Sequence, residues 1–327
     1  MKVLLIRFSS IGDIVLTSPV ARCLKLQTGA TVHFLTKQAF QSLLASNPHI
    51  DQVHSFDKDI QQVIPKLKAE QFDYIIDLHN NLRSLRVKLA LGRPSSSFRK
   101  LNLEKWLLVN IGVNFLPQKH IVDRYLDAAS HLGIANDNAG LDHFIPEKAQ
   151  VKLDTFGDNL SAGSYTAFAI GATHFTKRLP PAKMLEICQQ LQRPMVLLGG
   201  NAELESGNWL AEQLGSHVVN LCGKLSLQES ASVINQAAVV LTHDTGMMHI
   251  AAAFKKPVVS VWGSTVPEFG MYPYYPSELN LNSTIEVKGL SCRPCSKIGH
   301  TSCPKKHFRC MEEIDAESVV EAVEQYY

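Results

Sequence analysis

The sequence predicts an α/β protein made of two consecutive doubly wound domains, each a parallel sheet covered by helices on both faces. The chain has 327 residues, more than a single hydrophobic core usually serves. Apolar, β-branched runs alternate with helical patterns between residues 3 and 91, which is typical of a buried parallel sheet. The alternation weakens and then starts again at residue 165, which indicates a second sheet.

The first half of the chain alternates predicted strands with predicted helices. The strands cover residues 3–8, 31–36, 52–56 and 74–78, and the helices cover 13–27, 38–45, 60–69 and 82–91. Between residues 93 and 119 the pattern is weak, with an apolar patch around Trp106. A further helix is predicted from Ile121 to Leu132 because it ends at a glycine.

Residues 135–163 are rich in Asn, Asp, Gly and Pro, so we place the domain boundary near residue 155. The predicted domains are therefore 1–155 and 156–327. In the second, strands are expected at 165–170, 195–200, 218–221, 238–243 and 258–263, and helices at 182–191, 202–214, 226–237, 246–254 and from 315 onward. Whether the C-terminal helix packs back on the first domain stays open.

Composition limits the class of protein. The formal net charge is +2, which does not favour nucleic-acid binding. Arg7 interrupts the apolar run at the N-terminus, unlike a signal peptide, and no apolar run approaches the ~20 residues that span a bilayer. We therefore expect a cytoplasmic protein, and contact with a membrane surface stays open.

A polar loop, SSIGD, follows the first predicted strand and contains Ser9, Ser10, Gly12 and Asp13. Doubly wound proteins bind ligands beyond the carboxyl ends of their strands, where a helix N-terminus also attracts anions. The loop lacks the GxGxxG pattern of dinucleotide-binding proteins. By residue type alone, Asp13 is better explained as a helix N-cap than as a catalytic carboxylate.

Two loops of the second half carry residues suited to a nucleotide. Thr173 and Lys177 lie in GATHFTKRLP, which fits either a phosphate group or a solvated loop. Gly199 and Gly200 permit close backbone approach, and Glu203 after them fits either a ribose contact or a helix-dipole partner.

The loop THDTGMMH forms a predicted strand-to-helix turn at Asp244, Thr245 and Gly246. Its backbone N–H groups and hydroxyl suit a diphosphate. His249 lies one helical turn beyond Thr245, on the same side. A single histidine on such a helix is more often structural, but its position after this turn favours a functional role.

Together these motifs resemble those of glycosyltransferase family 9, the ADP-heptose:lipopolysaccharide heptosyltransferases. The resemblance covers nearly the whole chain and rests on the SSIGD loop, T-x-x-x-K-R-L-P, GG-x-x-E, D-T-G-x-x-H-x-A-A-A and a C-terminal C-x-x-C…C-P…C-M segment. It implies a GT-B fold, in which two Rossmann-like domains face a cleft, the first for the acceptor and the second for the sugar nucleotide. It also implies inverting transfer of heptose from ADP-heptose to an inner-core lipopolysaccharide sugar, without a metal ion or cofactor.

The resemblance also implies a role for each loop. Asp13 is expected to act as the general base that takes the proton of the acceptor hydroxyl. The resemblance therefore favours this role over that of a helix cap alone. Lys177 is expected to offset the charge that develops on departing ADP. The other expected donor contacts are Thr173, Glu203, Asp244, Thr245, Gly246 and His249. The expected acceptor-side residues are Ser9, Ser10, Gly12, Arg83 and Arg86.

Basic side chains gather in the middle of the first domain, at Arg83, Arg86, Lys88, Arg93, Arg99 and Lys100. A solvated helix face is the usual explanation of such a run. A basic patch would also suit a phosphorylated or carboxylated lipid-linked acceptor, with the Trp106 region resting on the cytoplasmic face of the inner membrane.

Four cysteines, Cys292, Cys295, Cys303 and Cys310, fall in one short segment. Their spacing permits a structural zinc site, with His300 and His307 as substitute ligands. Packed thiols or a labile disulfide are the favoured alternatives, because the segment lies outside the predicted cleft.

Two other functions stay open at this point. A family member could use a different nucleotide sugar, because the predicted loops suit a diphosphate better than they specify the sugar. A nucleotide-sugar-binding protein without catalysis is the second alternative, and the Asp13 carboxylate argues against it.

Overall fold

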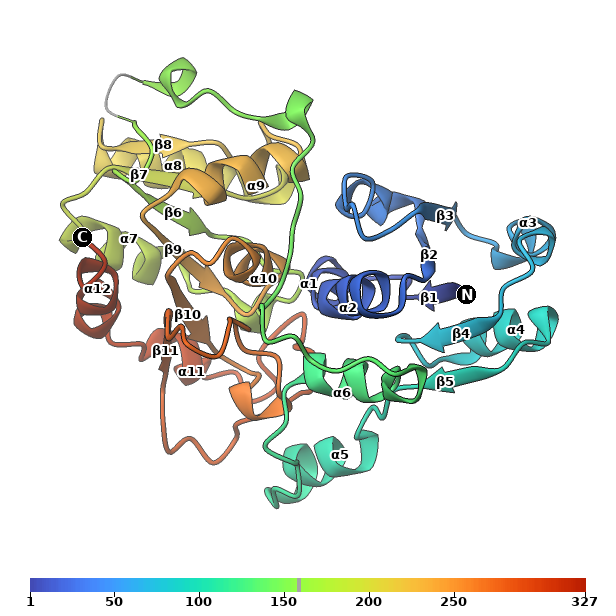
Figure 1. The fold of residues 1–327 in the computed structure, drawn as a ribbon. Coiled ribbons are helices and arrows are strands. Elements are labelled where there is room, and N and C mark those ends of the chain that lie inside the picture. The colour runs from blue at the N-terminus through green and yellow to red at the C-terminus, as the bar shows by residue number, and fades with distance from the viewer. Residues whose placement is uncertain (158–159) are drawn as a thin grey trace. The chain divides into compact units, whose positions relative to one another are not determined.

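The computed structural model describes residues 1–157 and 160–327 and divides the chain into two compact units. The first unit comprises Met1–Leu101, Lys119–Phe144 and Tyr274–Glu278, and the second comprises Asn102–Gln118, Ile145–Pro273 and Leu279–Tyr327. Figure 1 shows the order of their elements along the chain. The chain therefore passes from one unit to the other at several points, and not only near the boundary predicted at residue 155.

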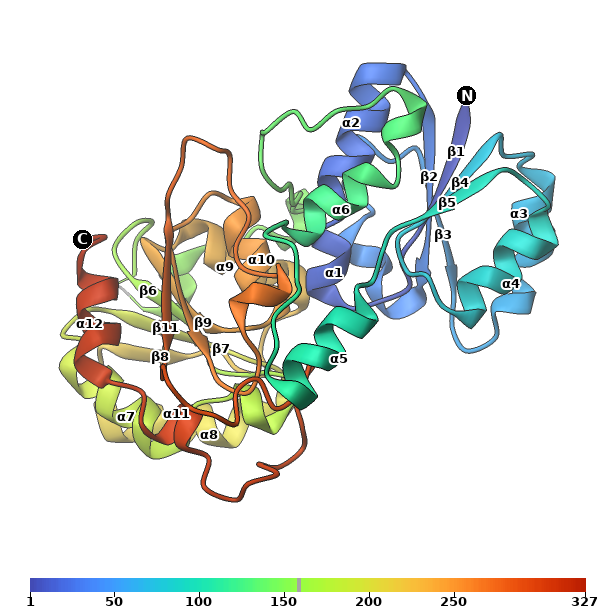
Figure 2. The same cartoon turned by 90° about the horizontal axis from the view of Figure 1, so that it is seen from below.

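The first unit is a parallel sheet of order β3-β2-β1-β4-β5. Its strands are β1 (Lys2–Ile6), β2 (Thr31–Lys37), β3 (Gln52–Phe56), β4 (Tyr74–Asp77) and β5 (Ser95–Ser97). Its helices are α1 (Ile11–Val15), α2 (Ser18–Thr28), α3 (Ile64–Ala69), α4 (Leu82–Leu91) and α6 (Ile121–Asp127), with short 3-10 helices η1 (Gln38–Leu43), η2 (Ile60–Gln62) and η3 (Ser130–Leu132). Helices α3 and α4 cover one face of this sheet and α2 and α6 cover the other (Figure 2).

The second unit is a parallel sheet of order β11-β10-β9-β6-β7-β8. Its strands are β6 (Thr166–Ala169), β7 (Met195–Leu198), β8 (Val218–Asn220), β9 (Val239–His243), β10 (Val258–Trp262) and β11 (Asn282–Glu286). Its helices are α5 (Asn102–Ile111), α7 (Pro181–Gln190), α8 (Leu204–Leu214), α9 (Leu227–Gln236), α10 (Gly246–Ala253), α11 (Arg309–Glu312) and α12 (Ala316–Glu324). Five 3-10 helices complete it, η4 (Glu147–Ala149), η5 (Leu153–Phe156), η6 (Phe175–Lys177), η7 (Asn201–Glu203) and η8 (Pro267–Phe269).

Each sheet is buried on both faces because its central strands are almost wholly apolar. Leu4 and Ile6 of β1 pack with Val87 of α4 in one core. Leu197 of β7 packs with Ile187 of α7 in the other. The strands predicted from buried runs are confirmed, since these runs correspond to β1, β2, β3, β4, β6, β7, β8, β9 and β10.

Several predicted helices are shorter than expected or of another type. The prediction of a single helix over 13–27 is wrong, because α1 ends at Val15 and a separate helix, α2, begins at Ser18. Pro19 lies in the first turn of α2, and its nitrogen carries no hydrogen that could bond to a carbonyl of the preceding turn. The predicted helix at 38–45 is the 3-10 helix η1, and the predicted helix at 60–69 is split into η2 and α3. The helix from Ile121 ends at Asp127 rather than Leu132.

The C-terminal helix α12 packs in the second unit. Val319 and Val323 of α12 are fully buried in the core that also contains Ile187 of α7. Within residues 1–157 and 160–327, no helix combines the length and the apolar character needed to cross a membrane.

Candidate active site

Each sheet changes its direction of winding beside its first strand. β1 pairs with β2 on one side and with β4 on the other, and β6 pairs with β7 and β9. Loops that leave the two strands at such a switch point run to opposite faces, so ligands of doubly wound proteins bind between them. The SSIGD loop follows β1, and the Asp244 loop follows β9.

Asp13 lies in the first turn of α1 and reaches back to the residue that starts the helix. Its Oδ2 accepts a hydrogen bond from Ser10 Oγ at 2.9 Å, and Ser10 N lies 3.5 Å from the same oxygen. Ser10 is therefore the N-cap of α1. The expectation that Asp13 is the N-cap is wrong, because Asp13 is the third residue of the helix. The Asp13 side chain is 18% exposed, so a substrate can still reach its carboxylate.

Arg7 forms an ion pair with Asp13 and hydrogen bonds to the backbone around it. Its Nη2 lies 2.7 Å from Asp13 Oδ2, and its Nε donates to the Ser9 carbonyl at 2.7 Å. Its Nη1 donates to the Leu78 carbonyl at 2.7 Å and to Tyr125 Oη at 3.1 Å. Burial acts to lower the pKa of Arg7, but the neighbouring Asp13 carboxylate leaves it above its ordinary value. The pair is therefore ionic, with the Asp13 carboxylate fixed in position.

The sequence analysis missed Arg7, although a signal for it was present. The residue interrupts the apolar run VLLIRF, and a charged side chain in a buried strand usually has an ionic partner. His79 was also missed. Its ring lies 4.7 Å from the Phe8 ring between centroids, directly after β4 at the switch point. Burial, reinforced by Arg7 and Lys100, lowers the pKa of His79 to about 4, so this imidazole is neutral at pH 7.

The remaining acceptor-side candidates differ in their surroundings. Gly12 is buried inside α1, and its φ is not positive. The Arg83 guanidinium lies 5.8 Å from the Phe8 ring centroid, whereas Arg86 is exposed on α4. Lys88 pairs with the buried Asp77 at 3.2 Å, so part of the predicted basic patch is internal structure.

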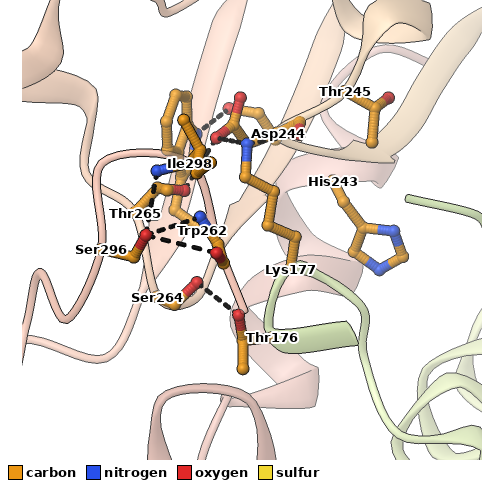
Figure 3. Close-up of polar contacts among 12 residues, drawn as sticks. Thr176, Lys177, His243, Asp244, Thr245, Trp262, Ser264, Thr265, Ser296 and Ile298 are labelled. Carbon is orange, nitrogen blue, oxygen red and sulfur yellow. Dashed lines mark hydrogen bonds and ion pairs between the residues drawn. The ribbon is translucent and has the colours of Figure 1, made fainter. Parts of the chain in front are cut away.

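In the second unit, Lys177 and Asp244 meet at the switch point (Figure 3). Lys177 Nζ lies 2.6 Å from Asp244 Oδ2, and Thr265 Oγ1 donates to the same oxygen at 2.7 Å. Both side chains are mostly buried, at 16% and 12% exposure, so the pair is only partly screened by water. The structure thus brings together two candidates that are far apart in the sequence.

The turn after Asp244 leaves the start of α10 without a side-chain cap. Thr245 is the N-cap, but its Oγ1 lies 3.2 Å from Thr242 Oγ1 and makes no cap hydrogen bond. The first N–H groups of α10, beginning at Gly246, therefore have no partner from the cap. His249 is only 2% exposed, so in this structure it lies within the packing of α10.

The loop that carries Lys177 is held by hydrogen bonds on both sides. Thr176 Oγ1 accepts from Ser264 Oγ and from the His300 N–H, both at 2.8 Å (Figure 3 shows the first). The Leu179 N–H donates to His243 Nε2 at 3.0 Å, and burial lowers the pKa of His243 to about 4, which keeps it a neutral acceptor. Thr173 precedes this anchored part and is exposed.

Glu203 packs over the ends of β6 and β7 rather than standing free. Its Oε2 accepts from the Gly200 N–H at 3.0 Å, and its Oε1 lies 3.5 Å from Arg178 Nη1. A Cβ on Gly171 or Gly199 would come within 2.8 or 2.7 Å of Glu203. At Gly199 the group that approaches the backbone closely is therefore this glutamate.

The four clustered cysteines are thiols in this structure. Cys292 Sγ lies 3.7 Å from His307 Nε2, and burial raises the pKa of Cys310 to about 12. Among residues 1–157 and 160–327, three metal-ligating groups come within 4.8 Å of one another at His33, His54 and Glu70, and not at the cysteines. The Cys295 N–H instead donates to the Ser264 carbonyl at 3.2 Å, so this segment supports the Lys177 loop.

A family model described as glycosyltransferase family 9 (heptosyltransferase) matches residues 60–302, well over half of the chain. The chain belongs to this family. Its resemblance to the family, inferred from the loops, is therefore confirmed, and the protein is a glycosyltransferase.

Individual relatives agree with this assignment. The chain is 22% identical to lipopolysaccharide heptosyltransferase 1 of Campylobacter coli, over 100% of this chain and 99% of that protein. A family 9 glycosyltransferase from Veillonella parvula superposes with a TM-score of 0.79 at 21% identity, covering 99% of this chain and 96% of that one. The E. coli ADP-heptose lipopolysaccharide heptosyltransferase II superposes with a TM-score of 0.75 at 21% identity, covering 100% and 98%. The two Rossmann-like α/β domains of this glycosyltransferase thus have the predicted GT-B-like fold.

Proposed function

We propose that this glycosyltransferase transfers heptose from ADP-heptose to a sugar of the lipopolysaccharide inner core, with inversion at the anomeric carbon. The names of the relatives support the donor and the acceptor. The observation that carries the reaction type is the pair of charged groups at the two switch points, Asp13 held by Arg7 and Lys177 paired with Asp244. In this proposal, residues 1–155 bind the acceptor and residues 156–327 bind the donor.

Asp13 acts as the general base in the proposed reaction. Its carboxylate, paired with Arg7 at 2.7 Å, accepts the proton of the acceptor hydroxyl as the hydroxyl oxygen attacks the anomeric carbon. The bond from that carbon to the ADP oxygen breaks on the opposite face, which inverts the configuration. Ser9, Ser10, Gly12, Arg83 and Arg86 form or flank the acceptor side.

Lys177 stabilises the diphosphate that leaves. Its ammonium is held by Asp244, and the uncapped N–H groups from Gly246 onward offer further donors to phosphate oxygens. These groups supply positive charge at the diphosphate from the chain itself, so the proposed reaction needs no metal ion. Thr173, Glu203, Asp244, Thr245 and His249 complete the proposed donor contacts.

The experiment that tests this function is a transfer assay with purified protein, ADP-heptose and deacylated inner-core acceptors. We expect ADP release that requires the acceptor, together with an acceptor product heavier by one heptose. Turnover with another nucleotide sugar alone would replace the donor in the proposal. Binding of ADP-sugars without any turnover would favour a binding protein instead of an enzyme.

Replacing Arg7 should damage catalysis through Asp13. In Arg7→Met the carboxylate loses its cation, so we expect kcat to fall by about 10- to 100-fold, with little change in KM for the donor. Because a cation favours the ionised carboxylate, its loss should also move the acid limb of the kcat–pH profile to higher pH. The measurement is the pH dependence of kcat for both proteins.

A matched control is Arg193→Met, which removes an exposed guanidinium that pairs with Glu324 at 2.9 Å. This variant should keep the wild-type pH profile. If Arg7→Met loses activity with an unshifted acid limb and a lowered Tm, the role of Arg7 is structural only.

We also propose that α5 and the segment after it contact the membrane surface that carries the acceptor. None of the residues of α5 is buried, and its neighbourhood exposes large apolar side chains: Leu103, Trp106, Ile111, Val113 and Phe115. Tryptophan is favoured at the boundary between headgroups and acyl chains.

Trp106→Ser should therefore weaken cosedimentation with phosphatidylglycerol-containing vesicles by about 3- to 10-fold, since one large apolar side chain is lost. Trp209→Ser, on the exposed surface of α8, is the control and should bind as the wild type does. Equal binding by all three proteins would refute the proposed contact.

A further inference from the structure

A second cluster of chemically capable side chains lies in the first unit, on β2, β3 and the end of α3. His33 is the third residue of β2, His54 is the third residue of β3, and Glu70 caps the end of α3 just before β4. Asp13 lies in α1, which follows β1. None of the three residues of the cluster belongs to the loops of the proposed acceptor side.

Strand register brings the two histidines together. His54 lies beside Leu35, two residues along β2 from His33, so both histidines project from the same face. His33 Nδ1 is 3.0 Å from His54 Nε2. Both side chains are buried, at 4% and 1% exposure, and the ring of Phe72 lies 5.3 Å and 6.2 Å from them between centroids.

The Glu70 carboxylate faces both nitrogens without hydrogen-bonding either. Its Oε2 lies 3.9 Å from His33 Nδ1, and its Oε1 lies 4.0 Å from His54 Nε2. These distances exceed hydrogen-bond length. A tetrahedral ion about 2.0–2.2 Å from each ligand would place the ligand atoms roughly 3.3–3.5 Å apart, between the N···N and N···O distances seen here. Small movements would therefore let the three atoms share one ion.

The two facing ring nitrogens share one proton, because His33 Nδ1 and His54 Nε2 lie within hydrogen-bond distance. His54 Nδ1 is buried without a hydrogen-bond partner. The neutral His54 ring is therefore best placed with its proton on Nε2, shared with His33 Nδ1, because an unpartnered lone pair is less costly than an unpartnered N–H. An ion bound at His54 Nε2 takes the place of that proton, which then moves to Nδ1 of the same ring. The described residues offer Nδ1 no acceptor, so binding of the ion must outweigh the cost of this buried N–H.

A cation already lies at the open side of the cluster. Lys2 Nζ is 3.0 Å from Glu70 Oε2 and donates to the Glu70 carbonyl at 3.0 Å. The Lys2 side chain is 35% exposed, so it can swing into solvent when another cation arrives. Its ammonium competes with a metal for the same carboxylate.

We propose that His33, His54 and Glu70 form a binding site for a divalent transition-metal ion such as zinc or cobalt. Two imidazoles and one carboxylate suit these ions and leave a coordination position for water. The bound ion would tie β2, β3 and the end of α3 together, so its expected effect is on the stability of the first unit. The proposal is independent of the transferase reaction.

The test is titration of the full chain with Co²⁺ in a Cys292→Ser/Cys295→Ser/Cys303→Ser background, which removes the most exposed thiol ligands. We expect weak visible bands typical of nitrogen and oxygen ligands, at one equivalent, and a rise in Tm with added Co²⁺ or Zn²⁺. Glu70→Gln, at a partly exposed position, should weaken binding by about tenfold or more. Lys2→Met should strengthen it, because it removes the competing ammonium.

His131→Gln, at an exposed histidine outside the cluster, is the control and should bind Co²⁺ with unchanged affinity. The proposal is overturned if the visible bands are absent from the triple-serine background. It is also overturned if Glu70→Gln binds Co²⁺ as tightly as the parent while remaining folded.

Discussion

Asp13→Asn is expected to lower kcat for heptose transfer by about 10²- to 10⁴-fold, the range that general base catalysis supplies. The amide keeps the size of the carboxylate and can still accept a hydrogen bond from Ser10, but it cannot take the proton of the acceptor hydroxyl. KM for the donor should change little, because the proposed donor contacts lie on the other unit. The measurement is acceptor-dependent ADP release under saturating donor.

Asp59→Asn is the matched control for this prediction. Asp59 is the N-cap of the short helix η2, where it accepts a hydrogen bond from the Gln61 N–H at 2.9 Å, and it belongs to the same unit as Asp13. Its variant should retain full activity. If Asp13→Asn keeps kcat within about tenfold of the wild type, well short of a lost general base, another group accepts the proton. His79 is then the next candidate, since it lies at the same switch point and is neutral at pH 7.

Lys177→Met is expected to have the second largest effect, with kcat lower by about 10²- to 10³-fold and a raised KM for ADP-heptose. The variant removes the charge that stabilises departing ADP. In the variant the Asp244 carboxylate keeps its hydrogen bond from Thr265 but loses its ion pair with Lys177. The unpaired negative charge of Asp244 then repels the diphosphate. Both effects should appear in steady-state kinetics with varied donor.

A double-mutant cycle with Asp244→Asn separates the two effects. If Lys177 acts on the leaving group, Lys177→Met should still lower kcat strongly in the Asp244→Asn background, while part of the KM defect disappears. If Lys177 only neutralises Asp244, the second substitution should restore kcat as well. Lys183→Met removes an ammonium paired with Glu186 at 2.7 Å on α7 and should leave both constants unchanged.

The positions of the candidate loops were predictable because the signals for them are local. Buried strands show as apolar runs, and the polar residues directly after them fall at the carboxyl edge of the sheet in any doubly wound arrangement. The start of the predicted helix at 226–237 also has a local signal, a Ser followed three residues later by Glu, and in the structure the Ser226 N–H donates to Glu229 Oε2 at 2.7 Å. Elements with weak local signals were missed: β5 is a run of serines, β11 is a half-polar edge strand, and α5 buries none of its residues.

The sequence by itself determined the class of fold, the order of strands and loops, and the chemical groups that those loops present. Only the tertiary structure decided which of these groups meet. Arg7 reaches Asp13, Leu78 and Tyr125 because β1, β4 and α6 pack together, and Lys177 finds Asp244 because β6 pairs with β9. His33 and His54 come within 3.0 Å through the register of β2 against β3. Strand pairing and register depend on packing between distant segments, so no local pattern of residues fixes them.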